Sequence, residues 1–320
     1  MSKANVITHR RSRHVTALFS PPFTRMFRWC GFGLFAASIC TTPVSGQASA
    51  NVSTLDPVYR DFEKLLAFQL VDTVILGQRP YTRLDFGRFT LQARGRLTPD
   101  HPANAHRIVA GLERRFVDEL DRLERGSAAG PVLFRPVDQV DLAVVAARTP
   151  GRAVRTDDRS GIDATVNPLL GYRQGRALDD GTTVSLEVAQ RLRLSNWLVA
   201  VTRPRLQASN GRDGVPNAEG FVLQEAYASV VLGILALHAG RSDMVWGQGR
   251  HSGLVVSENA IGMDMVKLSF ARPWVPPWIF GLLGPTQASI FLATTTADRA
   301  RVPLNSYMLG YKLSFQPTRW

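Results

Sequence analysis

Cysteine is nearly absent from this chain, and both copies lie close to its start. Cys30 and Cys40 are the two cysteines among 320 residues, so the sequence beyond residue 50 offers no disulfide framework and no thiol chemistry. A continuous apolar run of about eighteen residues is also missing, which excludes a membrane-spanning helix. The histidines after residue 50 do not have metal-ligand spacing, and we expect neither a metal nor a cofactor.

Clustered positive charge is missing too, although the formal net charge is +12. Six basic residues and no acidic ones fall in the first fifty positions, which leaves 32 basic against 26 acidic residues in the rest of the chain. These are spread along the sequence, and no Lys/Arg run has interleaved aromatics. Binding to nucleic acid is therefore not expected.

Residues 1–50 have the organisation of an export signal. A basic stretch precedes the short apolar run Trp29–Cys40, and the small residues Ala48–Ala50 fit a small-x-small cleavage pattern. We therefore expect residues 1–50 to be a signal peptide and the mature chain to begin near Asn51. An exported chain of this kind is periplasmic, secreted, or an outer-membrane barrel of a Gram-negative cell envelope.

Residues 51–130 show the 3.6-residue period of amphipathic helices. The first predicted helix has Asp56 as its N-cap and Pro57 in its first turn. The second begins at Pro80, and the third runs from Pro102 to Gly126. This pattern predicts a small bundle of three helices. The side chains expected in its core include Leu65, Leu112, Phe116 and Leu120.

In residues 131–320 the period changes to two, which is typical of β-strands. Along residues 182–194 one face is apolar and the other is mostly polar and charged. The apolar set is Val184, Leu186, Val188, Leu192 and Leu194, and the opposite set is Ser185, Glu187, Ala189, Arg191 and Arg193. We count about nine or ten such segments, separated by Gly, Pro, Asn and Asp turns.

Two architectures share this alternation, a soluble β-sandwich and a transmembrane barrel. The segments are roughly nine to thirteen residues long, which exceeds the usual strand and suits a tilted membrane-spanning one. Aromatic residues stand near segment ends, as in an interfacial girdle: Trp197, Trp246, Tyr307 and Tyr311. The pattern favours an antiparallel all-β transmembrane barrel that follows a small N-terminal α-helical bundle.

Two longer motifs give the chain a family resemblance. The first is "GQRPYTR" (Gly77–Arg83), in the helical part, and the second is "WGQGRHSGLVVSENA" (Trp246–Ala260), among the strands. Together with "GIDATVNPLLGYRQGR" and "LLGP", their order resembles the capsule-assembly (Wzi-type) outer-membrane proteins over residues 55 to about 295. Two positions depart from the family pattern, with Gln248 in place of the usual proline and Glu258 where Asn or Asp is common.

The resemblance implies a barrel whose periplasmic end is closed by a helical bundle, here residues 51–130 below the barrel of residues 131–320. It also implies a lectin, which binds capsular or extracellular polysaccharide and helps to attach it to the cell surface, and not an enzyme. Outer-membrane lipid and other capsule-export proteins are the further partners it implies. Family barrels have more strands than this chain supplies, so residues 131–320 form either a smaller barrel or, as we favour, the N-terminal part of a larger barrel.

The stretch Gly240–Asn259 has two interpretations. In the first it is a strand, a turn made by Gly247 and Gly249, and a returning strand, with Trp246 as a packing or girdle residue. In the second, Trp246 stacks on a sugar ring while Arg250 and Asn259 bind its polar groups. Arginines predicted to face the barrel interior would suit an acidic polymer: Arg191, Arg193, Arg203, Arg205 and Arg241.

Two other segments carry candidate residues. In "GQRPYTR", which includes Tyr81, Pro80 is expected to start a helix while Arg79 and Arg83 bond to the barrel wall or to helix ends. Direct ligand contact is the alternative. The run Arg272–Phe280 is either an extracellular loop with stacking tryptophans or a membrane-interface anchor. Arg272 is therefore a further candidate for polysaccharide binding.

Other function classes remain open at this point. A porin-like channel for sugars or other solutes is the main alternative, and a periplasmic β-sandwich binding module is a third. Catalysis is not expected, because His251 and Ser252 are sequence neighbours, so their side chains point to opposite faces of a strand. The carboxylates Asp243, Glu258 and Asp264 carry no signature of a glycosidase pair.

Overall fold

The computed structural model describes residues 46–72, 74–126, 132–147, 152–155, 163–166, 174, 181–210, 220–247, 249, 256–257, 261–295 and 306–317. Contacts divide the chain into two units, Met1–Pro43 and Val44–Trp320. All described residues belong to the second unit. Most of the predicted signal peptide therefore lies outside the described residues.

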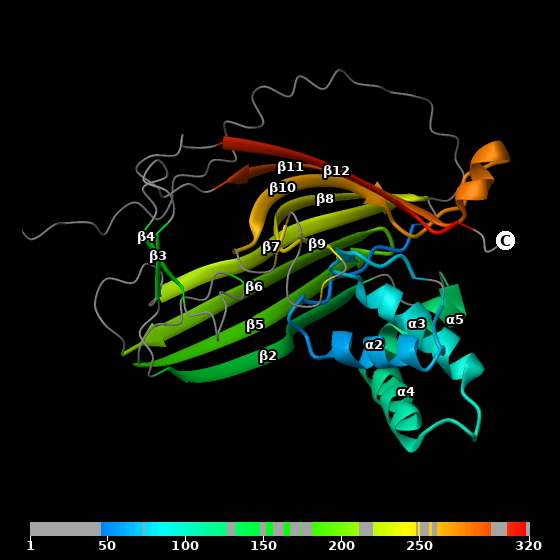
Figure 1. Ribbon diagram of the computed structural model, residues 1–320, viewed down its shortest axis with the longest axis horizontal. Helices are drawn as coiled ribbons and strands as arrows, with labels where there is room; N and C mark the ends of the chain where they lie inside the picture. Colours follow the sequence, from blue (N-terminus) through cyan, green and yellow to red (C-terminus); the bar gives the residue numbers. More distant parts are fainter. Residues whose placement is uncertain are drawn as a thin grey trace, which may run out of the picture. The chain divides into compact units, whose positions relative to one another are not determined.

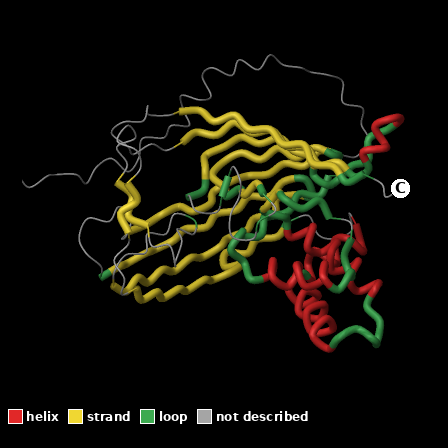
Figure 2. The backbone as a smooth tube through the Cα atoms, in the orientation of Figure 1, coloured by secondary structure: helices red, strands yellow, loops and turns green. Residues whose placement is uncertain are grey.

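The N-terminal part of the second unit is a bundle of helices (Figures 1 and 2). They are α2 (Val58–Ala67), α3 (Arg83–Arg96), α4 (Ala103–Arg115) and α5 (Val117–Arg125). As expected, Leu65, Leu112, Phe116 and Leu120 are all buried. The core is rich in aromatic rings, and the rings of Phe86 and Phe116 stack at 5.3 Å.

Two details of the bundle differ from the sequence prediction. The second helix does not begin at Pro80, because Thr82 caps α3: its side chain accepts from the Asp85 N–H at 3.1 Å, and the Asp85 carboxylate accepts from the Thr82 N–H at 3.0 Å. This reciprocal pair is a capping box. The third predicted helix is in fact two, because Phe116 leaves helical geometry (φ −109°, ψ 26°) between α4 and α5.

The first predicted helix is confirmed with a shift of one residue at its start. Pro57 occupies the N-cap position, and the Asp56 side chain accepts a hydrogen bond from the Val58 N–H at 2.9 Å. Asp56 thus satisfies a backbone donor at the helix start, as a capping carboxylate does.

Eight antiparallel strands form one sheet, in the order β12-β11-β10-β8-β7-β6-β5-β2 (Figure 1). Sequence neighbours pair with one another along almost its whole width. Its strands are β2 (Leu133–Ala147), β5 (Gly181–Ser195), β6 (Leu198–Ser209), β7 (Gly220–Leu232), β8 (Leu235–Ser242), β10 (Met263–Phe270), β11 (Thr286–Thr295) and β12 (Ser306–Phe315). The predicted long alternating strands are confirmed, and β2 and β12 are the two edges of the sheet in the described part of the chain.

Four shorter strands are also present in the described residues. β3 (Arg152–Arg155) pairs with β4 (Asp163–Val166). β1 (Gln78–Arg79) pairs with β9 (Val245–Trp246). The segment between β10 and β11 contains a short 3-10 helix, η2 (Trp278–Leu283).

The long sheet has its polar face buried and its apolar face exposed. Along β5 the buried positions include Glu187 and Arg191, whereas Val184 and Leu186 are exposed. A row of apolar side chains in register crosses four neighbouring strands, with Leu142, Leu186, Leu206 and Phe221 exposed by 69%, 37%, 55% and 60%. This is the reverse of the arrangement in a soluble sheet, where the apolar face is the buried one.

The helical bundle lies at one end of the sheet (Figure 1). The tight turns from β5 to β6 and from β7 to β8 are at that same end, as is the segment containing η2. The connections from β2 to β5 and from β8 to β10 are longer and leave the opposite end. Among the described helices, none is long and apolar enough to cross a membrane.

Candidate functional site

The two motifs that carry the family resemblance meet in space. Gln78 and Arg79 of the first motif pair with Trp246 and Val245 of the second in a two-stranded ladder. The Gly247 N–H adds a hydrogen bond to the carbonyl of Gly77 at 3.0 Å. These residues lie about 170 positions apart, so each motif is shaped to fit the other. The two motifs therefore form one junction, in which Gln78–Arg79 of the helical part pairs with Val245–Trp246 of the strand part.

Arg79 is the side chain that fastens this junction. Its guanidinium donates to the carbonyl of Gly249 at 2.8 Å and lies 5.9 Å from the centre of the Tyr59 ring. The Tyr59 hydroxyl in turn accepts a hydrogen bond from the Tyr81 N–H at 3.0 Å. Pro80 follows Arg79 through a cis peptide bond.

Trp246 is a buried residue, exposed by only 8%. Its indole packs edge-to-face on Phe291 at 5.0 Å, within a cluster that also contains Met244, Met265 and Ala293. The girdle interpretation of Trp246 is wrong, because a girdle residue lies on the exposed face. The location favours packing over sugar stacking, since little of the indole is open to a ligand. Gly247, at φ 150°, adopts a backbone conformation that L-residues rarely tolerate.

Two of the polysaccharide-binding candidates lie outside the described residues. These are Arg250 and Asn259, so the predicted grouping of Trp246 with them is not placed by the structure. Gly249 is described and exposed. The remaining two candidates, Arg241 and Arg272, are described and do not lie on the β1–β9 junction.

The arginines of the sheet are mostly bound to carboxylates. As expected, Arg191, Arg193, Arg203 and Arg205 are buried on the polar face. Arg203 pairs with Glu225 at 3.2 Å, and Arg205 with Glu187 at 3.5 Å. Arg241 forms a bidentate salt bridge with Asp264, with both N···O distances at 2.8 Å. The positive charges of these three arginines are thus already paired with carboxylates of the protein, whereas an acidic polymer would need them for its own binding.

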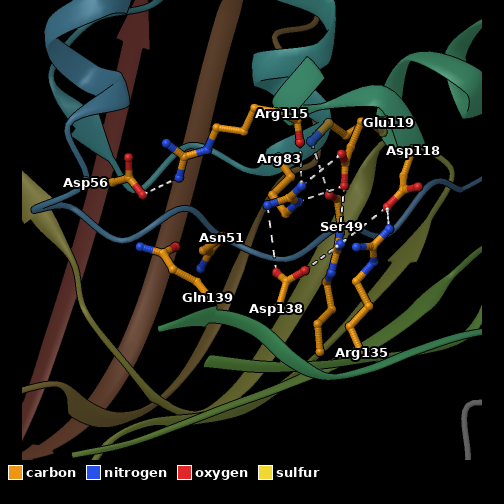
Figure 3. Close-up of polar contacts among 12 residues, drawn as sticks. Ser49, Asn51, Asp56, Arg83, Arg115, Asp118, Glu119, Arg135, Asp138 and Gln139 are labelled. Atoms are coloured by element: carbon orange, nitrogen blue, oxygen red, sulfur yellow. Dashed lines mark hydrogen bonds and ion pairs between the residues drawn. The ribbon is translucent and has the colours of Figure 1, made fainter. Parts of the chain in front are cut away.

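A buried network of charges holds the helical bundle against the sheet (Figure 3). Glu119 of α5 accepts from Arg83 of α3 at 2.8 Å and from Arg191 of β5 at 2.6 Å. Arg191 also donates to Asp138 of β2 at 2.9 Å. Arg135 of β2 donates to Asp118 at 2.6 Å. Each ionised side chain here has an opposite charge in contact, as burial demands.

The network also fixes the charge states of its members in the helical bundle. Burial alone would raise the pKa of Glu119, but the guanidinium groups of Arg83 and Arg191 outweigh burial and hold that pKa below its usual value. Burial likewise opposes the charge of Arg83, and the attraction of Glu119 outweighs it, so the pKa of Arg83 is raised. Glu119 therefore stays ionised at neutral pH and connects three elements.

A cavity of about 360 Å³ lies between the bundle and the sheet. Its wall includes Asn51, Pro80 and Tyr81 on the side of the bundle and Arg272 from the segment after β10. From the sheet it is lined by polar side chains that the sequence analysis did not single out: Ser229, His238, Lys267, Ser269 and Gln287. The one signal for them in the sequence is that they stand on the polar side of strongly alternating strands.

The described residues hold no group of three or more histidine, cysteine, aspartate or glutamate side chains placed to bind a metal ion. Asp243, one of the carboxylates weighed as a catalytic pair, accepts from the side chain amides of Gln174 and Gln224 and is buried. Asp264, the second, is held by Arg241. Glu258, the third, lies outside the described residues.

Comparison with known proteins identifies the family of the chain. Neither the curated proteins nor the solved structures include a match to this chain. The family model of the capsule assembly protein Wzi matches residues 156–320, more than half of the 320 residues. The matched region begins before β4 and includes the strands of the long sheet other than β2, as well as β9 and the second motif. The chain therefore belongs to the Wzi family of capsule assembly proteins.

Proposed function

We propose that this protein is an outer-membrane β-barrel protein that binds capsular polysaccharide and helps to attach it to the cell surface, without catalysing a reaction. Family membership supports a role in capsule assembly. The helical bundle would close the periplasmic end of the barrel, and the long connections at the other end of the sheet would face the outside.

One observation carries the membrane part of the proposal, namely the reversed faces of the sheet. Leu142, Leu186 and Leu206 form an exposed apolar row, while Glu187 and Arg205 lie buried on the opposite face. Water disfavours such an apolar surface, at about 25 cal/mol per Å² of apolar area. Lipid tails would cover it without that penalty, as they do in barrels with an apolar exterior and polar interior.

The docked bundle argues against the porin-like alternative. It is fastened across the polar face by Glu119, Arg191 and Asp138. A channel for solutes would need that path open. A barrel that serves as a surface-attachment protein does not.

The proposal is tested in an encapsulated host cell from which the gene has been deleted. We expect the cells to release capsular polymer into the medium and to recover surface capsule when the full-length gene is returned. The returned protein should fractionate with urea-washed outer membranes. Intact protein in the soluble periplasm would refute the barrel. Unchanged capsule together with lost solute uptake would favour the porin instead.

A further inference from the structure

The cavity between the bundle and the sheet contains polar groups without partners. His238 is 4% exposed, and its Nε2 atom is buried with no hydrogen-bond partner. The side chain amide nitrogen of Asn51 and the side chain oxygen of Gln287 are in the same condition. Buried polar atoms are nearly always paired, and each unpaired one costs roughly 1–3 kcal/mol. The three residues that carry these atoms all line the cavity, which favours a polar ligand there.

A positive charge lies in the same wall. Lys267 is the register partner of His238 across β8 and β10, and both side chains line the cavity. No described carboxylate lies within ion-pair distance of its ammonium group. The contrast with the sheet arginines is informative, because Arg203, Arg205 and Arg241 all have carboxylate partners. Lys267 is thus a half-buried cation without a carboxylate partner among the described residues.

The remaining wall is suited to a compact polar ring. Pro80, Tyr81 and Phe270 provide apolar surface, and Ser229 and Ser269 provide hydroxyl groups. The acidic residue Asp85 is already held by Arg88 at 2.7 Å and by the N-cap of α3. The volume of about 360 Å³ falls within the range of small-molecule sites, roughly 300–1,000 Å³.

We propose that this cavity binds one acidic sugar unit, a pyranose that carries a carboxylate. The carboxylate pairs with Lys267, and the ring hydroxyls pair with Asn51, His238 and Gln287. The identity of the ligand as a sugar rests on the proposed function. The site lies at the bundle end of the sheet, away from the long connections, so it is distinct from a surface that grips polymer outside the cell.

The test uses the full-length protein in detergent and two simple probes, methyl glucuronide and methyl glucoside. They differ chiefly in the carboxylate, so their comparison isolates the pairing with Lys267. By titration calorimetry or saturation-transfer NMR we expect the glucuronide to bind at least about tenfold more tightly, as a charged hydrogen bond requires. Lys267→Met should reduce its affinity to that of the glucoside.

Lys64→Met is the matched control, because Lys64 is an exposed lysine of α2 whose partner is Asp61. It should leave both affinities unchanged. Lys267→Gln provides a second variant of similar shape, and thermal unfolding identifies any variant that has lost its fold. The site would be overturned if neither probe bound to the wild-type protein, or if folded Lys267→Met and Lys267→Gln bound the glucuronide as tightly as the wild type does.

The two proposals fail in different experiments. If the glucuronide does not bind but deletion of the gene still releases capsule, the cavity inference fails and the proposed function stands. If capsule is unaffected by the deletion while the glucuronide binds, the proposed function fails and the cavity remains a site for acidic sugars.

Discussion

Glu119 illustrates how charge is used at the scale of single residues. It is 1% exposed and lies between the guanidinium groups of Arg83 and Arg191. Arg83 also stacks on the Phe116 ring at 5.1 Å. One carboxylate therefore connects α3, α5 and β5, and its role is to hold the bundle on the sheet.

Replacing Glu119 should loosen this attachment. Glu119→Gln leaves two buried arginines facing one neutral amide, and removal of one partner of a buried ion pair typically costs about 3–5 kcal/mol. We expect faster proteolysis within residues 51–130 and a lower unfolding midpoint. Glu124→Gln is the control, because Glu124 pairs with Arg94 on the exposed surface, where a pair contributes less than about 1 kcal/mol.

The lowered pKa of Glu119 also predicts that the attachment of the helical bundle to the sheet depends on pH. Because the pKa of Glu119 is lower in the folded protein than its usual value of 4.5, its stabilising effect is complete above that pH. The effect is lost as the pH falls through the lower folded value. Protease resistance of the bundle should decline there in the wild-type protein and much less in Glu119→Gln. An equal decline in both would show that other groups control the attachment.

At the scale of secondary-structure elements, the positions of the strands could be predicted from the sequence, but which face of each strand is buried could not. The alternation in residues 182–194 identified β5 and separated its two faces. A strand has a period of two whether its apolar face packs against a protein core or against lipid. Which of its two faces is buried could therefore be learned only from the structure. The break at Phe116 was missed because no proline or glycine marks it, and buried ring packing positions that residue.

The candidate site was predicted only in part, for a related reason. Both motifs were visible in the sequence, but the pairing of Gln78 with Trp246 is a long-range contact that no local pattern encodes. Trp246 was considered a girdle or packing residue because it stands near the end of a predicted strand, and its packing on Phe291 is visible only in the structure. Lys267 and His238 belong to no motif, and their importance follows from missing partners, which are visible only in three dimensions.

The segment before α2 leads to a prediction about processing. Ala48 is fully buried, its N–H donates to the carbonyl of Asn196 at 2.7 Å, and its carbonyl accepts from Arg122 at 3.0 Å. Ser49 accepts from the Leu84 N–H at 3.1 Å. Cleavage near Asn51 would remove all three contacts, so we now expect the mature chain to begin at or before Gln47. N-terminal sequencing of the outer-membrane form decides this, and a start at Asn51 would contradict it.

At the scale of the whole molecule, the structure bears on whether the segment with η2 is an extracellular loop or a membrane-interface anchor. Trp278 is 93% exposed, and Ile279 and Leu282 beside it are exposed as well. The segment leaves the sheet at the end where the bundle lies, next to the tight turns. If that end faces the periplasm, these side chains suit a membrane-interface anchor and not an extracellular loop. Arg272, at the start of the segment, lines the cavity instead.

The sheet exposes its apolar face and buries its polar face. The substitution Leu142→Arg tests most directly whether that exposed face is in contact with lipid. Leu142 is 69% exposed and lies in the middle of β2, in the apolar row across the sheet. If the row faces lipid, an arginine near the bilayer midplane costs about 2–4 kcal/mol. In a soluble protein the same surface change would usually alter stability by no more than about 0.5 kcal/mol.

Val117→Arg is the matched control, because Val117 is an apolar residue of the helical bundle and is 58% exposed. A surface position of the bundle should accept arginine in either case. We expect Leu142→Arg to lower both the yield in outer membranes and the urea midpoint in lipid vesicles, while Val117→Arg changes neither. Equal tolerance of the two substitutions would mean that water covers the apolar row, and the barrel would have to be abandoned in favour of a soluble sheet.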